Sequence, residues 1–299
     1  MIPCGVIISE LMDQMDNPRG TADEVYTKQV WEKLNEAYRD VCGAFNWTSL
    51  QEQATLTDSS YIVPADCRTI LFVKDEDHQP YNFMPGSNRA SNFDKNWYFN
   101  TPVAAALASG TTLAIWEYAT SVTATAEFPA TTCVGEFIRI GSNTGIYKVA
   151  TWTSTSALTI SDYFRGTQQA NALFQIRPRG TPILAFCDSS GTALTPSGVT
   201  VTYVRYPLPL FRDEDIIELP GYAPAVKVAA LRKLLAMKGF NQAADRKQDE
   251  YLAALSEMKA SEPQQTAQFQ PNSMFRTRYT STGSMTGRYV RGLNLINNG

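Results

Sequence analysis

The first 45 residues carry two stretches in which apolar side chains recur three or four positions apart. This spacing predicts one helix over residues 6–15 and a second that starts at Thr21, where Glu24 completes a capping box. Residues 17–20, Asn-Pro-Arg-Gly, separate the two helices. The apolar face of the second helix consists of Trp31, Leu34, Tyr38, Val41 and Phe45. Because each helix has a single apolar stripe, we expect both to pack against partner elements.

From residue 51 onward the pattern changes to short β-prone runs separated by Asp, Ser, Pro and Gly. We expect strands of a first sheet at 55–57, 62–63, 70–73 and 113–118, resumed at 183–187 and 199–205. The chain between 120 and 180 is almost entirely strand and turn, with short strands expected at 136–140, 146–151, 158–163 and 173–176. This density of strands predicts a small closed or half-closed barrel, inserted into a loop of the first sheet at residues 123–180.

Helical spacing returns after Gly221. One apolar stripe stops at Gly239, a residue type that commonly ends helices, and its members are Val228, Leu231 and Leu235. A further stripe predicts a last helix over residues 242–260. Beyond residue 261 the chain consists mainly of Gln, Asn, Ser, Thr, Gly and Arg, so it is too polar to build a core of its own.

Together these elements predict an α+β fold. We expect a helical bundle made from N- and C-terminal helices, with a central β region carrying an inserted small β-barrel-like domain and an extended C-terminal arm. The expected domains are 1–122 for the N-terminal helices and the first part of the β region, 123–180 for the insert, 181–260 for the return strands and C-terminal helices, and 261–299 for the arm.

Composition excludes several classes of protein. Hydrophobic residues make up 43% of the 299 positions, which is enough for a packed core. No apolar run approaches the roughly 20 residues that span a bilayer, so we expect no membrane partner. The short apolar stretch at the N-terminus follows no basic residue and does not resemble a signal peptide. Five widely spaced cysteines indicate small buried thiols, and neither a disulfide framework nor a zinc site.

Charge is distributed unevenly along the chain. The net charge is −3, while residues 261–299 hold four arginines, no lysine and one acid, for a charge of +3. Residues 1–260 therefore carry −3 − 3 = −6. A mildly acidic body argues against sequence-specific binding of duplex DNA, which requires a basic face for the phosphates.

Three segments resemble a known family in their order and spacing. Residues 34–42 are Leu-Asn-Glu-Ala-Tyr-Arg-Asp-Val-Cys, followed by Phe-Asn-Trp at 45–47. Residues 61–68 are Tyr-Ile-Val-Pro-Ala-Asp-Cys-Arg, and residues 201–207 are Val-Thr-Tyr-Val-Arg-Tyr-Pro, ahead of an acidic stretch at 213–220. These segments resemble the second helix, the step into the next strand, and the return strand of the head-to-tail connector (adaptor) proteins of tailed bacteriophages.

The resemblance covers about residues 1–120 and 181–260, and the insert at 123–180 is larger than this family usually carries there. It implies a non-enzymatic structural protein of the virion, located at the head-tail junction and assembled in the host cytoplasm. It further implies a homo-oligomeric ring of twelve copies with the portal above and a tail or nozzle protein below. Genomic DNA would pass through the ring without specific binding. A neighbouring subunit, the capsid or a tail fibre could contact the insert.

The resemblance also implies roles for two groups of residues. Carboxylates close to the third predicted helix, or those on the opening helices, are expected to line the DNA channel, and the candidates close to the third helix are Asp213, Glu214, Asp215 and Glu218. They lack the glycine and the spaced ligands of a calcium loop, so we expect no metal site. The arm interleaves arginine with aromatic residues and is a candidate portal-docking segment, through Phe269, Phe275, Arg276, Arg278, Tyr279, Arg288, Tyr289 and Arg291. The same composition also suits nucleic acid or an arm without a partner.

Enzymatic chemistry finds little support in the sequence. The single histidine, His78, lies in a charged run before Pro80 with no nucleophile motif nearby, so we expect a solvated hairpin tip. A cell-wall-degrading tail enzyme would need a pair of catalytic carboxylates, and no lysozyme-like signature accompanies the acids of this chain. We therefore expect no enzyme and no cofactor. Another tail structural protein, such as a nozzle, decoration or fibre-docking component, remains the alternative.

Overall fold

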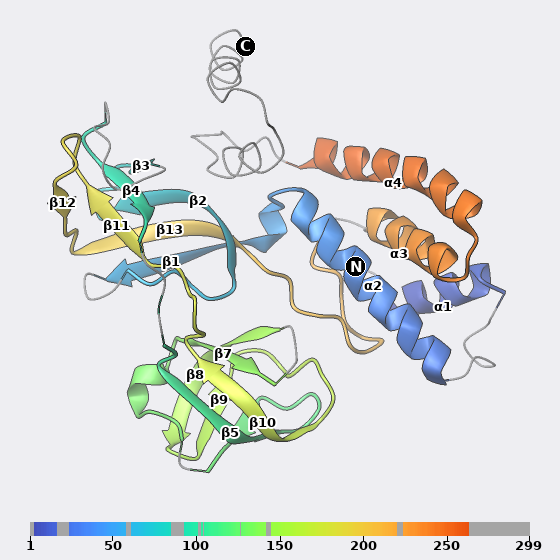
Figure 1. The fold of residues 1–299 in the computed structure, drawn as a ribbon, viewed down its shortest axis with the longest axis horizontal. Coiled ribbons are helices and arrows are strands. Elements are labelled where there is room, and N and C mark those ends of the chain that lie inside the picture. Colours follow the sequence, from blue (N-terminus) through green and yellow to red (C-terminus); the bar gives the residue numbers. More distant parts are fainter. Residues whose placement is uncertain are drawn as a thin grey trace, which may run out of the picture.

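In the computed structural model, the described residues are 3–16, 24–57, 61–84, 93–100, 103, 105–125, 127–141, 145–219 and 224–262. Across these ranges the chain has an α+β fold with four α-helices, two open sheets and a closed six-stranded barrel (Figure 1). The expected fold class is therefore confirmed. The predicted helix breaker at 17–20, the cap at Thr21 and the glycine at 221 lie outside the described residues.

The helices form where the apolar spacing predicts them. Their bounds are α1 (Cys4–Gln14), α2 (Glu24–Ala44), α3 (Pro224–Met237) and α4 (Asn241–Ser261). Along α2 the buried face contains Val30, Leu34, Tyr38 and Val41, at the expected spacing of three and four. The α3 helix ends just before Gly239, which has a φ of +84° and so provides the left-handed residue that terminates many helices.

All four helices contribute to one hydrophobic cluster. The α3 helix packs against both α2 and α4, and α1 packs against α2 and α3. Strands and loops complete this cluster through Leu71, Val204, Leu210, Ile217 and Leu219. Because the helices do not enclose a core by themselves, the expected helical bundle of N- and C-terminal helices is not supported as a separate unit.

The first open sheet has its last strand at its centre. Its strands are β1 (Gln51–Thr57), β2 (Cys67–Asp75) and β13 (Gly198–Arg205), in the order β1-β13-β2 and all antiparallel. Val201 of β13 lies opposite Ala54 on one side and Val73 on the other. The expectation that residues 199–205 return to the first sheet is therefore confirmed.

A second open sheet packs on the first. It consists of β3 (Asn82–Phe83), β4 (Asn96–Phe99), β11 (Leu184–Cys187) and β12 (Ala193–Leu194), in the order β12-β11-β4-β3. Trp97 and Phe186 from this sheet share a cluster with Val73 and Val201 from the first. The expected placement of 183–187 in the first sheet is thus wrong, because β11 pairs with β4 and β12.

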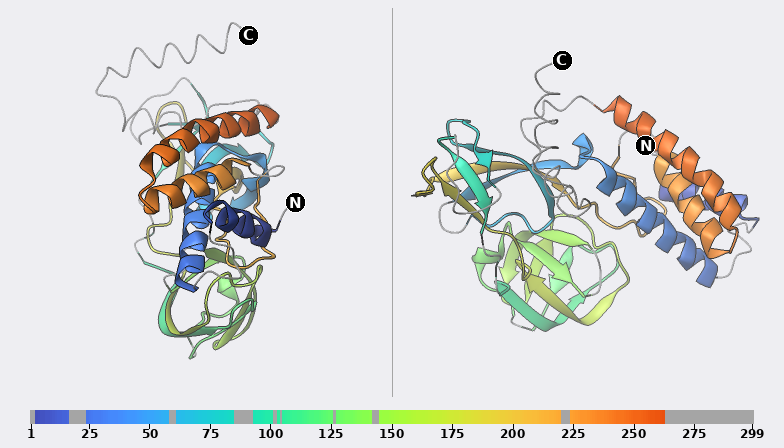
Figure 2. Two further views of the ribbon diagram at one scale, coloured as in Figure 1. Left: turned by 90° about the vertical axis from the view of Figure 1, so that its right-hand side faces the viewer. Right: turned by 45° about the horizontal axis from the view of Figure 1, so that its top comes forward.

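The inserted domain is a closed barrel with its own core. Its strands are β5 (Ala108–Ile115), β6 (Ser121–Thr123), β7 (Phe137–Ile140), β8 (Ile146–Ser154), β9 (Ala157–Ile160) and β10 (Gln169–Ile176). The barrel core is a separate hydrophobic cluster that includes Phe128, Tyr147, Phe164 and Phe174. Figures 1 and 2 show the barrel projecting from the body on the side away from α4.

The barrel starts earlier than the expected boundary at residue 123. Strand β5 pairs with β10 from Ala108 to Ile115 and closes the barrel. Leu113 and Ile115 point into the barrel core. A strand with one buried face has the same alternating pattern in either sheet, so the sequence could not assign β5 to the barrel.

Two antiparallel segments join the barrel to the body. The backbone N–H of Val103 donates to the carbonyl of Thr181 at 2.9 Å, and the N–H of Gly180 donates to the carbonyl of Val103 at 2.9 Å. On the barrel side, Leu107 N–H donates to Ile176 O at 2.9 Å. The two ends of the insertion therefore lie next to each other, as an inserted domain requires.

Candidate functional site: the polar joint between barrel and helices

The predicted acidic stretch lies on the extended segment that connects β13 to α3. This segment passes between the barrel and the helices (Figure 1). The start of α1 binds to it through two backbone hydrogen bonds, from Cys4 N–H to Asp215 O and from Gly5 N–H to Asp213 O, both at 2.9 Å. A Cβ on Gly5 would come within 2.8 Å of Asp213 Cβ, so this close approach requires glycine.

Asp215 is the centre of this polar joint, and its side chain is completely buried. One carboxylate oxygen, Oδ2, accepts the backbone N–H groups of Phe211 at 2.6 Å and Arg212 at 2.9 Å. The other, Oδ1, accepts a hydrogen bond from the hydroxyl of Tyr163, which belongs to the barrel. Three donors satisfy the buried carboxylate and fix the turn against the barrel.

Arg212 completes the joint by stacking between two barrel tyrosines. Its guanidinium carbon lies 4.3 Å from the ring centre of Tyr118 and 4.1 Å from that of Tyr163. Its Nε lies 3.6 Å from Asp215 Oδ1. Burial, and then the hydrogen bond to Asp215, raise the pKa of Tyr163, so this hydroxyl remains a donor at neutral pH. These cation–π contacts of Arg212 with Tyr118 and Tyr163 attach the barrel to the body at a place separate from the two connecting segments.

Glu218 lies in a different ion pair. Its two carboxylate oxygens accept hydrogen bonds from the two terminal nitrogens of Arg205, at 2.9 and 3.2 Å. The hydroxyl of Tyr38 on α2 accepts the backbone N–H of Glu218 at 3.1 Å, so the acid connects α2 to the end of β13. Arg205 also pairs with Glu52 of β1 at 2.8 Å. Glu218 is therefore a structural group that joins the helices to the first sheet.

The four acids predicted to line a channel occupy different environments. Asp215 and Glu218 bind partners within the subunit, and Asp213 is half-buried, whereas the side chain of Glu214 is 77% exposed. A channel wall needs carboxylates that face solvent, so the prediction is wrong for Asp215. The sequence shows the charge of these acids but not their environments, because their partners come from distant segments. Tyr163 and Asp215, for example, are 52 positions apart.

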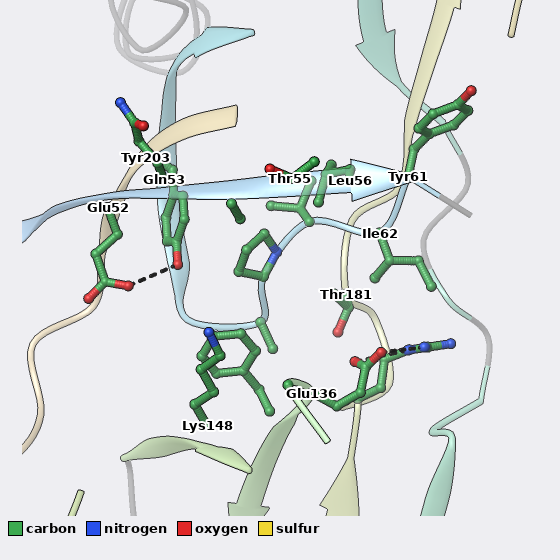
Figure 3. A pocket seen from close by; sticks show the side chains of 17 residues that line it. Glu52, Gln53, Thr55, Leu56, Tyr61, Ile62, Glu136, Lys148, Thr181 and Tyr203 are labelled. Carbon is green, nitrogen blue, oxygen red and sulfur yellow. Dashed lines mark hydrogen bonds and ion pairs between the residues drawn. The ribbon is translucent and has the colours of Figure 1, made fainter. Parts of the chain in front are cut away.

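A groove of about 360 Å³ separates the first sheet from the barrel (Figure 3). Glu52 reaches down from β1 toward the hydroxyl of Tyr203, while Lys148 and Glu136 rise from the barrel. Directly after the lining residues Pro64 and Ala65, the carboxyl of Asp66 is buried, and one of its oxygens has no hydrogen-bond partner in the described part of the chain. Burial first, and then the negative charge of Glu52, raise the pKa of Asp66 to about 7.

No described residues form a cluster of three or more His, Cys, Asp or Glu side chains suited to a metal ion. His78 is exposed in the turn after β2, with a φ of +60°, as expected for a hairpin tip. Of the cysteines, Cys4, Cys42, Cys133 and Cys187 are buried free thiols, while Cys67 is half-buried.

The described chain ends with Glu262, which is buried against the start of the first sheet. Its Oε2 accepts the hydroxyl of Thr48 at 2.7 Å and the N–H of Thr48 at 3.2 Å. The eight predicted portal-docking residues follow Glu262 and lie outside the described residues.

Sequence reasoning did not find Tyr118, Tyr163 and Arg212, because no local motif marks a contact between a barrel and a distant turn. Among the helices described, none combines the length and hydropathy needed to cross a membrane. A scan against protein-family models finds no family that matches this chain, and a search of curated proteins finds no matching relative.

Proposed function

We propose that this chain is a structural virion protein of a tailed bacteriophage, an adaptor in the ring that joins the portal to the tail. The observation that carries the proposal is the direct contact among the three segments that resemble the connector family. Arg68 donates to the carbonyl of Phe45 at 2.8 Å and to the side-chain oxygen of Asn46 at 3.1 Å. Tyr206 N–H donates to Asp66 O at 2.7 Å, and Arg205 pairs with Cys67 across the sheet.

These contacts support the resemblance because they give its three segments one structural role. The end of α2, the entry to β2 and the end of β13 meet at one place, where the helices join the first sheet. Contact among the three segments makes them parts of one joint in this fold and supports treating their resemblance together.

In the proposed adaptor, the four helices together with the first sheet form the ring body. Identical subunits would meet through heterologous contacts that close by rotation into a ring of twelve. The arm after Glu262 would bind the portal, a tail or nozzle protein would dock on the opposite side, and the barrel would face a tail fibre, the capsid or a neighbouring subunit. The proposal includes no catalytic residue and no cofactor.

DNA would pass such a ring without adhering to it. The net charge of −6 over residues 1–260 supports this, because like charges repel the phosphates. Glu214 is the acid of the predicted set with the side chain most open to solvent, so it is our candidate for the channel wall. Asp215 and Glu218 would maintain the subunit structure behind it.

Mixing the purified chain with the portal protein of the same phage tests the proposal. We expect a complex on size-exclusion chromatography, and negative-stain images in which a ring covers the narrow end of the portal. If the isolated chain forms a trimer that does not bind the portal, it would instead be a fibre or spike component. If no complex forms at low or high salt, the adaptor proposal is wrong.

A further inference from the structure

Strand β1 has an unpaired edge that faces the groove. Among the described strands, β1 pairs with β13 alone. Five consecutive residues of β1, from Glu52 to Leu56, line the groove. Successive side chains of a strand point to opposite faces, so a cavity lined by every residue in turn runs along the edge of the strand and not across one face. The edge therefore presents backbone N–H and C=O groups to the groove.

The walls of the groove suit an extended peptide. Ile62 and Pro64 line the groove beside β1, and the barrel supplies Lys148 and the ion pair of Glu136 with Arg177 opposite β1 (Figure 3). Addition of a strand to an exposed sheet edge is a recurring mode of peptide recognition, in which the backbone gives affinity and alternating side chains give specificity.

The arm starts near the beginning of β1. Glu262 is held by Thr48, three positions before β1 begins at Gln51, and 37 further residues follow it. The seven residues of β1 extend over about 23 Å. The twelve residues from 263 to 274 can span up to about 40 Å, so residues 275–280 can reach any position along β1.

Residues 275–280, Phe-Arg-Thr-Arg-Tyr-Thr, have the pattern of a strand with two different faces. Phe275, Thr277 and Tyr279 alternate with Arg276 and Arg278, so one face is aromatic and the other is basic. Aromatic and threonine side chains favour strands.

We propose that the edge of β1 binds residues 275–280 of the same chain as an added β-strand in the free subunit. The short connection from Glu262 favours the chain's own arm over that of a second copy, because tethering raises its effective concentration to the millimolar range. If the chain is the proposed adaptor, the portal then competes with β1 for the arm. Docking on β1 does not depend on that function, so the following test examines the free subunit alone.

Hydrogen exchange on the β1 amides measures the docking directly. We expect the β1 amides that face the groove to exchange about tenfold more slowly in the full chain than in a chain truncated after Gln264. The amides of β13, which lie at the centre of the sheet, should exchange equally in both and so show that the truncated subunit is folded. Equal exchange of β1 in the two proteins would overturn the proposal.

Proline variants separate strand addition from other effects of the arm. Neighbouring N–H groups of a strand point to opposite sides, so either Thr277→Pro or Arg278→Pro removes a hydrogen bond to β1 and should restore fast exchange there. Thr266→Pro makes the same change in the linker and should keep β1 protected. Protection that both Thr277→Pro and Arg278→Pro leave intact would contradict an added strand. Protection that grows with protein concentration would assign the arm to a second copy and overturn docking within one chain.

Discussion

At the scale of single residues, Asp66 makes the stability of the protein depend on pH near neutrality. Burial raises the pKa of this carboxyl from 3.8 to about 7, so the folded state keeps it protonated while the unfolded chain ionises. The contribution of Asp66 to stability is therefore fully present below about pH 4, falls as the pH rises from 4 to 7, and stays lower above that range. Each pKa unit corresponds to about 1.4 kcal/mol, so the loss is on the order of 4 kcal/mol.

Replacing Asp66 by Asn should remove most of this pH dependence. We expect Asp66→Asn to unfold at a higher urea concentration than the natural protein at pH 8, and at nearly the same concentration at pH 4. Urea unfolding curves at the two pH values check the prediction. An equal loss of stability between pH 4 and pH 8 in both proteins would show that Asp66 is not the responsible group.

Tyr163 gives a second prediction at this scale. Tyr163→Phe removes the hydroxyl that donates to Asp215 and leaves one oxygen of a buried carboxylate without that donor. The loss should be about 1–3 kcal/mol in the free energy of unfolding. Tyr206→Phe, at a residue that is 52% exposed, is the matched control and should change stability little. If the two variants lose the same stability, the joint at Asp215 contributes nothing specific.

At the scale of elements, the sequence predicted those with strong local patterns. The four helices were found because their apolar stripes follow helical spacing and, for α3, because Gly239 ends the stripe. The assignment of strands to sheets failed at β5 and β11, since a strand's partner depends on long-range packing and not on its own alternation. The polar joint was not predictable either, because its arginine and tyrosines are recognisable only after the barrel has been placed beside residues 211–215.

A deletion variant can test whether the barrel and the body fold independently of each other. Its own hydrophobic cluster and adjacent chain ends predict that residues 104–179 can be replaced by a short Gly/Ser linker from Val103 to Gly180. The shortened protein should remain soluble and helical by circular dichroism, with stability reduced because Arg212 and Asp215 lose their tyrosine partners. Consistent aggregation of the shortened protein, with an isolated barrel that also fails to fold, would show that the two parts share one core.

At the scale of the whole molecule, the proposed adaptor depends on its arm to hold the portal. A chain truncated after Gln264 retains Glu262 and its bonds to Thr48, so the subunit should stay folded. We expect its affinity for the portal to fall at least about tenfold, which corresponds to about 1.4 kcal/mol. Titration of portal with labelled subunit measures this. The full chain carrying Thr266→Pro is the control, and equal binding by the truncated chain would remove the arm from the docking interface.

The position of β13 between β1 and β2 has a consequence for synthesis on the ribosome. Strands β1 and β2 are complete at Thr57 and Asp75, but the strand that separates them is complete only at Arg205. At about 5–20 residues per second, the intervening chain takes on the order of ten seconds to translate. The barrel ends at Ile176 and can fold during this interval. Until β13 is made, β1 and β2 lack their partner strand, so other nascent chains can pair with them. The yield of soluble protein should therefore depend on the rate of translation between these strands, independently of the stability of the finished fold.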